Sequence, residues 1–550
     1  MKVAEAFVQV LRSVGVSTFF GLPGSTEAAL LEAVRDDGEL RYVLALHEGV
    51  AVSMADGYAR ATGRPGLVGL HTSVGTMNGL SQVFNALRDG SPVVVTAGHK
   101  DRAVLAEGAF CAVADLASLA RPVTKWAHQS LRSRDVASDL SRAIHLAVQP
   151  PAGPTYLTVP EDLMREEVEG PRPAELPGGS VLAAGPAPDV VRAAAELLLS
   201  ARRPVLLAGS RARRALGALR AASEELELPV FLAPFTDLAD LPYPTTDGRA
   251  LGLYGEDDSL LEGVDVVLAV GCRVFYAFSE VARPRLPPGA RLVHAHDDPD
   301  EIGRVNRADV GLLGDPRLSL DALVGEVRRR GGISGHQREE RCRHRDDLRR
   351  RRGEAVRAEL ARSDPDAVPM GVERVAEALG AVLPTGAILV DEGVRSSRTL
   401  LRHLPVGDRQ LVMRSSGGAL GWGTPAAVGA KVGRPERPVV AVVGDGSFQF
   451  SVQAIWSSVE AGAPIVVVVL DNGGYLAVKR AIEGYVGLAH DRRHHPGTEI
   501  AGVDHLAVAK GYGADGVAVT KSSDLGPAVE SGLAGERPFV VHVRVAQVRP

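Results

Sequence analysis

Two short polar turns carry side chains that could bind a metal ion and a diphosphate. The first contains Asp445, Gly446 and Ser447, and the second contains Asn472 and Gly474. A carboxylate and an amide carbonyl are hard oxygen donors of the kind that Mg²⁺ prefers. Glycines and the free amides at a helix start let the backbone approach and hold phosphate oxygens. Together the turns predict a metal–diphosphate site, although one glycine-rich turn alone would be ordinary in a strand–helix unit.

Two parallel strands joined by a helix are needed to position these turns. The apolar runs 439–443 and 465–470 predict the strands, and residues 451–461 predict the helix between them. Parallel strands need such a crossover, and their carboxyl ends meet at one edge of the sheet, where open α/β sheets bind ligands. We therefore expect Asp445 and Asn472 to lie side by side.

The whole chain predicts three doubly wound, parallel-sheet α/β domains. We expect them at residues 1–165, 189–325 and 366–550, with linkers at 166–188 and 326–365. The first linker is rich in Pro, and the second is rich in Arg with acidic residues between. Charge runs of mixed sign are typical of a solvated linker or helix surface, and a basic binding arm is the alternative.

The strand pattern recurs along each domain. The strand-like runs are 18–20, 42–46, 67–70, 92–97 and 154–159 in the first domain, 205–208, 230–233, 264–270 and 291–295 in the second, and 388–390 and 410–413 ahead of the two turns in the third. A weak echo between GYARATGRPGLVGL and GAKVGRPERPVVAVV fits two related sheets flanking a third, although so short a match also arises by chance.

Composition excludes several classes of protein. The 550 residues are 45% hydrophobic and 23% charged, with a net charge of −5, which is ordinary for a soluble globular protein and gives no reason to expect nucleic acid as a partner. The three cysteines form no CxxC pair. No apolar run approaches the roughly 20 residues of a membrane span. The first helix is not a signal peptide, so we expect a cytoplasmic protein without a membrane partner.

The turns themselves resemble a known cofactor motif. GDGS…DNGGY is similar to the thiamine-diphosphate motif of the pyruvate decarboxylase and acetolactate synthase superfamily. The resemblance implies thiamine diphosphate and Mg²⁺ as cofactors, with Asp445, Asn472 and the carbonyl of Gly474 as metal ligands. The superfamily usually has Asn-Asn where this chain has Asp471-Asn472, and the difference falls on the position that is not a ligand. The other cofactor-binding candidates of this motif are Gly446, Ser447 and Tyr475.

Glu48 is the candidate for activating the cofactor. From position alone it is a glutamate in the first turn of a helix, where the helix dipole stabilises its charge. The segment HEGVAVSMADGYARATGRPG resembles the activating-glutamate segment of the superfamily. The resemblance implies that Glu48 contacts N1′ of the aminopyrimidine and favours its imino form, whose nitrogen removes the C2 proton. Asn78 is a further cofactor-binding candidate in this pyrimidine-binding domain.

The segment Gly417–Trp422 resembles the loop that seats the aminopyrimidine. That likeness implies that the carbonyl of Gly418 accepts from the 4′-amino group and that Leu420 supports the bent cofactor. The alternative is that Leu420 is a core leucine in a turn, because buried leucines are so frequent.

Segments such as FGLPGSTEAAL and LARPVTKWAH resemble the benzoylformate decarboxylases, and this likeness spans nearly the whole chain. It implies that Ser25 binds a substrate carboxylate and that His71 transfers protons, for which the ordinary pKa of histidine is suited. Without it, a structural role is favoured for each, Ser25 as a turn residue and His71 as a histidine at a strand end. The family's second histidine is missing, since Phe278 stands in its place.

The resemblance implies non-oxidative decarboxylation of a 2-oxo acid to an aldehyde and CO₂. It also implies an active site between two subunits of a homotetramer. One alternative is a carboligase or lyase that forms or cleaves acyloins, which slow protonation beside Phe278 would favour. Another is a non-catalytic paralogue, which intact Glu48, Asp445 and Asn472 disfavour. A flavin-dependent oxidase is disfavoured because the middle domain lacks a GxGxxG loop.

Overall fold

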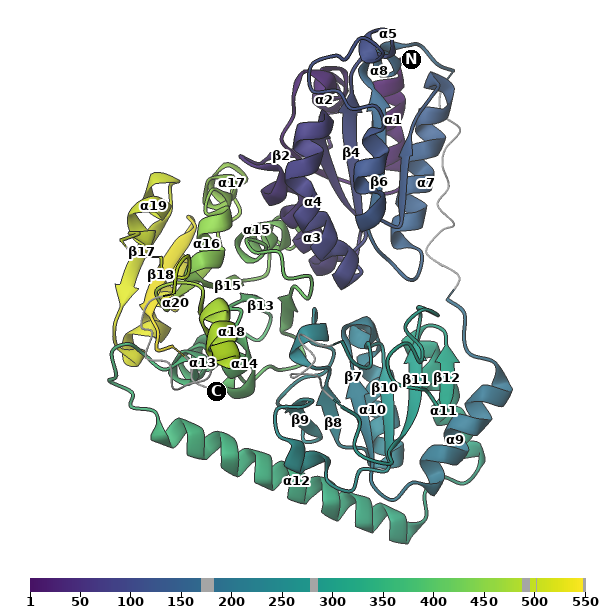
Figure 1. Cartoon of the computed structure of the whole chain (residues 1–550), viewed down its shortest axis with the longest axis vertical. Coiled ribbons are helices and arrows are strands. Elements are labelled where there is room, and N and C mark those ends of the chain that lie inside the picture. The colour runs from purple at the N-terminus through teal and green to yellow at the C-terminus, as the bar shows by residue number, and fades with distance from the viewer. Residues whose placement is uncertain (170–182, 277–284, 487–494, 501, 548–550) are drawn as a thin grey trace.

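Three six-stranded parallel sheets, each covered by helices, make up the molecule (Figure 1). The computed structural model describes residues 1–169, 183–276, 285–486, 495–500 and 502–547. The three sheets define an N-terminal, a middle and a C-terminal domain. This architecture confirms the expected fold class, and the middle of the first linker lies outside the described residues.

The N-terminal sheet has the strand order β2-β1-β3-β4-β6-β5. Its strands are β1 Thr18–Gly21, β2 Arg41–Leu44, β3 Gly66–His71, β4 Val93–His99, β5 Trp126–Gln129 and β6 Thr155–Pro160. Its helices are α1 Val3–Ser13, α2 Ala28–Asp37, α3 Glu48–Thr62, α4 Thr72–Asp89, α5 Arg102–Leu105, α6 Leu116–Ala120, α7 Val136–Val148 and α8 Glu161–Arg165, with 3₁₀ turns η1 Ser25–Glu27, η2 Arg121–Val123 and η3 Ser133–Asp135.

The middle sheet has the order β12-β11-β10-β7-β8-β9, which is the arrangement of dinucleotide-binding folds. Its strands are β7 Pro204–Ala208, β8 Val230–Leu232, β9 Ala250–Leu253, β10 Val266–Val270, β11 Arg291–His296 and β12 Val310–Leu313. Its helices are α9 Pro188–Ser200, α10 Leu216–Leu226 and α11 Pro316–Arg329, with 3₁₀ turns η4 Ser210–Ala215, η5 Phe235–Asp237 and η6 Asp258–Leu261.

The C-terminal sheet, β14-β13-β15-β16-β18-β17, repeats the strand order of the N-terminal sheet, as the sequence echo suggested. Its strands are β13 Ile388–Glu392, β14 Leu411–Arg414, β15 Val439–Gly444, β16 Val466–Asp471, β17 Asp515–Val519 and β18 Phe539–Arg544. Its helices are α13 Val372–Val382, α14 Ser396–His403, α15 Gly423–Gly433, α16 Asp445–Ser451, α17 Ala454–Glu460, α18 Leu476–Val486, α19 His505–Gly511 and α20 Ser522–Ala534.

Helices α3 and α15 join the N-terminal and C-terminal domains at backbone contact. A Cβ atom on Gly57 would lie 2.0 Å from the carbonyl oxygen of Ala426, and one on Gly429 would lie 1.8 Å from that of Met54. Only glycine allows the two backbones to approach this closely. Buried side chains of both domains form one continuous core around this crossing.

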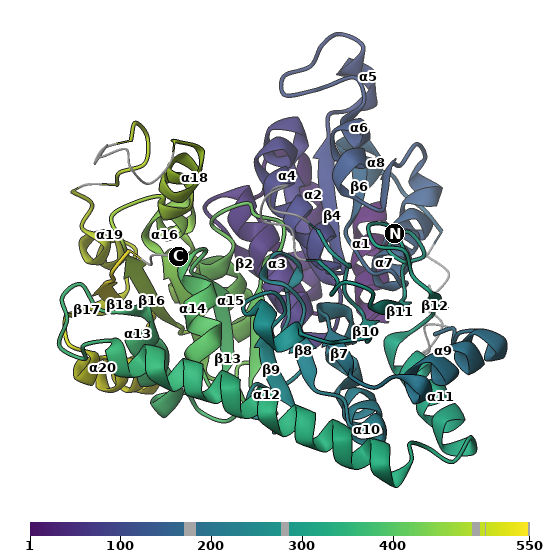
Figure 2. The same cartoon turned by 60° about the horizontal axis from the view of Figure 1, so that its bottom comes forward.

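Several local expectations are wrong in detail. The helix expected at 451–461 begins earlier, at Asp445, and is divided into α16 and α17, and residues 72–76, which follow the expected strand 67–70, form the first turn of α4. The Arg-rich interval contains α12 Gly335–Arg362, which runs along the middle and C-terminal domains (Figure 2). Within the described ranges, no helix combines the length and the apolar character needed to cross a membrane.

Candidate functional site

The two predicted turns lie side by side at the carboxyl edge of the C-terminal sheet. Strands β15 and β16 pair in parallel with Gly444 opposite Leu470, so Asp445 and Asn472 follow neighbouring strand ends. Oδ2 of Asp445 and Oδ1 of Asn472 are both buried and accept no hydrogen bond. Buried polar atoms without partners are rare, and two unpaired oxygen donors at one edge fit a Mg²⁺ ion.

Asp445 is the first residue of α16 and is 1% exposed. Burial raises the pKa of its carboxyl to about 6, and the neighbouring charge of Asp471 adds to the shift, whereas the backbone amides of Gly446 and Gly474 oppose it. A cation bound here would favour the ionised carboxylate. The buried carboxylate of Asp445 therefore lies in a site where a bound cation would offset the cost of its negative charge.

Two glycines at this edge allow neighbouring groups to pack directly against the backbone. A Cβ atom on Gly446 would lie 2.6 Å from the ring of Tyr475, so this ring packs directly on the helix start. Gly474 has φ +142°, and a Cβ atom there would meet the carbonyl of Thr498 at 2.0 Å. The backbone N–H of Tyr475 donates to the same carbonyl at 2.9 Å. Ser447 is buried in the first turn of α16.

The acidic residue that replaces the usual asparagine has its own partners. Asp471 Oδ2 lies 3.0 Å from Nε2 of His542, and its other oxygen accepts the backbone N–H of Gly473 at 2.9 Å. The hydrogen bond from His542 lowers the pKa of Asp471. The extra carboxylate is thus turned toward β18, which leaves Asn472 as the neighbouring donor to the predicted metal.

Glu48 is the first residue of α3, and its carboxylate is largely buried. Nδ2 of Asn78, on α4, donates to Oε2 of Glu48 at 3.0 Å. The helix start is held by His47, whose Nδ1 accepts the backbone N–H of Gly49 at 3.0 Å. Gly75 lets α4 approach, because a Cβ atom there would lie 3.2 Å from Oε1 of Glu48. The structure thus fixes the orientation of this glutamate.

Ser25 and His71 come together at the edge of the N-terminal sheet. Nδ1 of His71 lies 3.1 Å from Oε2 of the buried Glu27 and 3.0 Å from Oγ1 of Thr26. Ser25 begins the same 3₁₀ turn, is exposed, and accepts from Nζ of Lys100 at 3.4 Å. The exposed hydroxyl and the lysine ammonium together could bind a carboxylate, and the imidazole of His71 lies beside Thr26, the residue that follows Ser25.

The loop Gly417–Trp422, which precedes α15, accepts hydrogen bonds from two side chains of the N-terminal domain. Nδ2 of Asn85 donates to the carbonyl of Ala419 at 2.8 Å, and Nε2 of Gln82 donates to that of Leu420 at 2.9 Å. Gly418 is exposed with φ +88°, and Leu420 is half-buried rather than a core residue. The loop therefore presents Gly418 and Leu420 outward, on the surface that the cofactor is expected to contact.

Glu392, at the end of β13 in the C-terminal domain, holds the end of the same loop and the start of α15. Its carboxylate accepts the backbone N–H groups of Gly421, Trp422 and Gly423 at 2.7 to 3.2 Å. Burial nevertheless raises its pKa to about 7. Sequence reasoning missed Glu392, as it missed Glu27, Gln82 and Asn85.

The two halves of the predicted site do not meet within one chain. Among the described residues, no hydrogen bond joins Glu48 to Asp445 or Asn472. Two cavities, of about 420 and 770 Å³, are lined by other residues. Phe278, the position of the family's second histidine, lies outside the described residues.

A stripe of apolar side chains on α4 is exposed beside Glu48. Val74 is 41% exposed, Met77 51% and Phe84 37%, and these spacings put them on one face of the helix. Leu46 lies two residues before Glu48 and is 43% exposed, and Phe450, on α16, is 56% exposed. Contiguous exposed apolar side chains mark interaction surfaces.

Comparisons with known proteins cover all three domains. Residues 1–119 match the N-terminal TPP (thiamine pyrophosphate, or diphosphate) binding domain of thiamine pyrophosphate enzymes, residues 191–323 the central domain, and residues 395–543 the C-terminal TPP binding domain. A benzoylformate decarboxylase of Pseudomonas aeruginosa is 33% identical, over 100% of this chain and 99% of that protein. An acetolactate synthase large subunit of Parasynechococcus marenigrum is 28% identical, over 98% and 87%. The solved structure of a thiamine diphosphate-dependent 4-hydroxybenzoylformate decarboxylase from Rhodococcus jostii RHA1 has a TM-score of 0.87 and 30% identity, with 99% of each chain covered.

Proposed function

The chain belongs to the thiamine pyrophosphate enzyme family, and from that premise we propose that it is a Mg²⁺-dependent, non-oxidative decarboxylase of a 2-oxo acid, releasing an aldehyde and CO₂. The observation that carries the metal-dependent site is the pair of buried, unpartnered oxygens on Asp445 and Asn472. The 2-oxo acid is supported by the names of the relatives, two of which are decarboxylases of benzoylformate or its 4-hydroxy derivative.

Each residue has a role that its surroundings support. Asp445, Asn472 and the carbonyl of Gly474 would hold Mg²⁺, and the amides of Gly446 and Ser447 would bind the diphosphate. Tyr475, whose ring packs on Gly446, would contribute to the same cofactor site. When bound, thiamine diphosphate supplies the carbanion and the electron sink of decarboxylation. The side chains and backbone of the protein would position the cofactor and the substrate and would transfer protons.

The N-terminal domain would supply the acid–base groups. Glu48, oriented by Asn78, would hold a proton at N1′ of the aminopyrimidine, and the carbonyl of Gly418 would accept from its 4′-amino group. Leu420 would support the bent cofactor from below. Glu48 is a catalytic residue in this account, and Asn78 is a positioning residue.

The substrate would be bound beside the first glycine loop. Its carboxylate would accept from the hydroxyl of Ser25 and interact with the ammonium of Lys100, which already lies 3.4 Å from that hydroxyl. His71, held by Glu27, would give or take a proton at the carbon that loses CO₂. This arrangement places an anion-binding group and a proton-transfer group on one edge.

Self-association is part of the proposal, with the site completed by a second copy. The exposed apolar stripe on α4 borders Glu48, and Phe450 is exposed on the helix that starts at Asp445. A partner covering both surfaces would exclude water and bring its Asp445 edge toward Glu48. We propose at least a dimer and, by family likeness, a homotetramer.

A carboligase is the second candidate function. It is supported by Phe278, which replaces the family's second histidine, and by the likeness to an acetolactate synthase. If protonation after CO₂ release is slow, a second carbonyl compound can compete with the proton, and an acyloin results.

The test is to incubate the protein with thiamine diphosphate, Mg²⁺ and a panel of 2-oxo acids, including benzoylformate, and to measure CO₂ and the organic product. CO₂ with free aldehyde is expected. CO₂ with only coupled product would replace the decarboxylase by the carboligase. No CO₂ from any acid, with cofactor bound, would contradict the decarboxylase and would mean a different donor substrate or a non-catalytic paralogue.

A further inference from the structure

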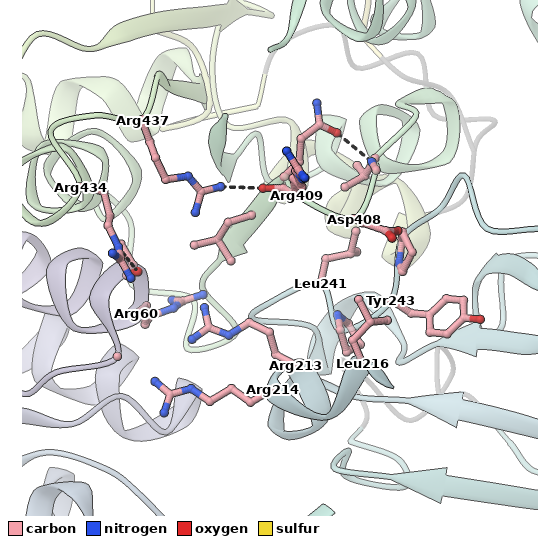
Figure 3. A pocket seen from close by; sticks show the side chains of 18 of the residues that line it. Arg60, Arg213, Arg214, Leu216, Leu241, Tyr243, Asp408, Arg409, Arg434 and Arg437 are labelled. Carbon is pink, nitrogen blue, oxygen red and sulfur yellow. Dashed lines mark hydrogen bonds between the residues drawn. The ribbon is translucent and has the colours of Figure 1, made fainter. Parts of the chain in front are cut away.

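A cavity of about 420 Å³ lies where the three domains meet, away from the predicted cofactor site. The ends of α3 and α15, the 3₁₀ turn η4 and the residues around 241–244 and 406–411 line it. Figure 3 shows guanidinium groups from all three domains around this one space. The cavity is large enough for a small organic ligand.

Its charge is strongly positive. The arginines that line it are Arg60, Arg213, Arg214, Arg409, Arg434 and Arg437. The acidic residue among the described lining residues is Asp408, and both of its oxygens accept hydrogen bonds from Arg220, at 2.6 and 2.8 Å. The lining therefore holds more positive charge than its own carboxylates balance.

Some of these arginines have structural roles. Arg60 is buried and pairs with Asp240 at 2.6 Å and with Asp89 at 3.2 Å, and Arg213 lies 3.3 Å from the other oxygen of Asp240. Nε of Arg434 donates to the carbonyl of Ala61 in the last turn of α3. Cations at helix C-termini are stabilising, so these contacts need no ligand.

Arg214 and Arg409 have no such role. Both are exposed, and neither side chain makes a hydrogen bond or ion pair with any residue in the described ranges. The guanidinium of Arg214 lies against Gly63, where a Cβ atom would approach it to 2.4 Å. Burial, followed by the charges of Arg60 and Arg214 acting against Asp240, lowers the pKa of Arg213. Like charges are therefore crowded together here.

We propose that this cavity binds a small organic anion with two or more phosphate groups, of the nucleoside diphosphate kind. Guanidinium groups bind phosphate oxygens in a fork. Arg214 of the middle domain and Arg409 of the C-terminal domain both line the cavity, and neither side chain has a hydrogen-bond or ion-pair partner in the described ranges. Leu216, Leu241 and Val406 give apolar walls that suit the organic part of such a ligand.

The position of the cavity gives the ligand a regulatory effect on the cofactor site. Helix α3 starts at Glu48 and ends beside Gly63, and α15 follows the Gly417–Trp422 loop and ends beside Arg434. The two helices touch at backbone contact, so they move as one unit. An anion that draws the three domains together at one end would shift Glu48 and the loop at the other. Coupling of this kind is reciprocal, so the ligand changes the affinity for thiamine diphosphate.

The test is calorimetric titration of the thiamine diphosphate–Mg²⁺ holoprotein, in excess Mg²⁺, with ADP and separately with inorganic tripolyphosphate. We expect micromolar binding that weakens at least tenfold in the Arg214→Ala/Arg409→Ala double variant. The matched control is Arg192→Ala/Arg307→Ala, which removes the same charge at two exposed arginines outside the cavity. If ADP binds more tightly than tripolyphosphate, the organic part of the ligand contributes to binding. If the two probes bind with equal affinity, the phosphate groups account for the binding alone.

Two outcomes would overturn the proposal. If neither probe binds, or if both bind the double variant and the wild type equally, the cavity is not the site. The regulatory part is tested by the dissociation constant of thiamine diphosphate for the apoprotein with and without saturating ADP, and no change would overturn it. Neither readout needs turnover, so a failure here is distinct from a failure of the proposed decarboxylation.

Discussion

The side-chain amide of Asn78 donates to the carboxylate of Glu48 at 3.0 Å, and this bond ties α4 to the first residue of α3. One and two turns further along α4, Gln82 and Asn85 donate to the carbonyls of Leu420 and Ala419. A single helix of the N-terminal domain therefore orients both the predicted activating glutamate and the loop predicted to seat the aminopyrimidine. Rotation or loss of this helix would disturb both parts of the site together.

Replacing Asn78 should test that positioning role. Asn78→Ala removes a hydrogen bond to a charged group, worth about 1.5–3 kcal/mol, so we expect turnover to fall by about tenfold or more with little change in thiamine diphosphate affinity. Ser81→Ala, at another exposed position on α4, is the control. Steady-state CO₂ release and calorimetry measure the two quantities. Wild-type turnover in Asn78→Ala would show that Glu48 needs no such partner.

The metal site is tested by its two unpaired oxygens. Asp445→Ala and Asn472→Ala should each weaken Mg²⁺ binding by about 100-fold or more, because even partners outside the ligand sphere contribute about 10–100-fold. Asp471→Asn, which restores the residue usual in the superfamily, should keep the metal because its side chain is turned toward His542. Titration with Mg²⁺ in the presence of the cofactor measures this. Undiminished binding in Asp445→Ala would place the metal elsewhere.

Mg²⁺ affinity should also depend on pH. Burial raises the pKa of Asp445 to about 6 in the metal-free protein, and Mg²⁺ needs the ionised carboxylate. We therefore expect a constant dissociation constant above about pH 7 and a loss of up to about tenfold per pH unit below pH 6. Titrations from pH 5 to 8 test this, and affinity that is flat across the range would contradict the assignment.

The same shift has a consequence for the stability of the metal-free protein. Because the pKa of Asp445 is higher in the folded than in the unfolded chain, the folded state binds more protons between these values. Its contribution to stability is complete below about pH 4 and is lost as pH rises through about 6. Asp445→Asn should remove this part of the pH dependence in denaturant unfolding of the metal-free protein.

How much of this could be read from the sequence depends on the range of the contacts. The neighbouring positions of Asp445 and Asn472 follow from two apolar runs and a crossover helix, and the parallel register confirms them. The start of α16 at Asp445 was missed because the glycine turn suggested a loop, whereas the extended Gly444 caps the helix directly.

Partners distant in the sequence could not be predicted. Asn85 and Ala419 are 334 positions apart, and no local pattern links them. No local pattern distinguishes Glu27 either, although its carboxylate accepts the backbone N–H groups of Gly24 and Gly98 and lies beside His71. Five strands were also missed: β5, β9, β12 and β17 at sheet edges, and the inner strand β18. Of these, β5 is partly exposed and β17 largely exposed, and neither carries a strong apolar run.

If the exposed apolar stripe of α4 forms the interface between two copies of the chain, a charged side chain placed in it should weaken their association. Met77→Asp places a carboxylate in the exposed apolar stripe, so we expect sedimentation velocity to show smaller species and lower turnover. Val305→Asp, at a residue of the middle domain that is 38% exposed, is the matched control. A Met77→Asp protein that sediments like the wild type would mean that this face of α4 is not the interface.

Glu48→Gln, compared with the wild type as holoproteins on the same 2-oxo acid, is the most direct test of the central claim. The account predicts that thiamine diphosphate still binds, because the metal and diphosphate ligands are untouched, and that CO₂ release falls by about 100-fold or more, the scale of acid–base catalysis. Turnover at the wild-type rate with cofactor bound would contradict the role of Glu48 and the shared mechanism built on it.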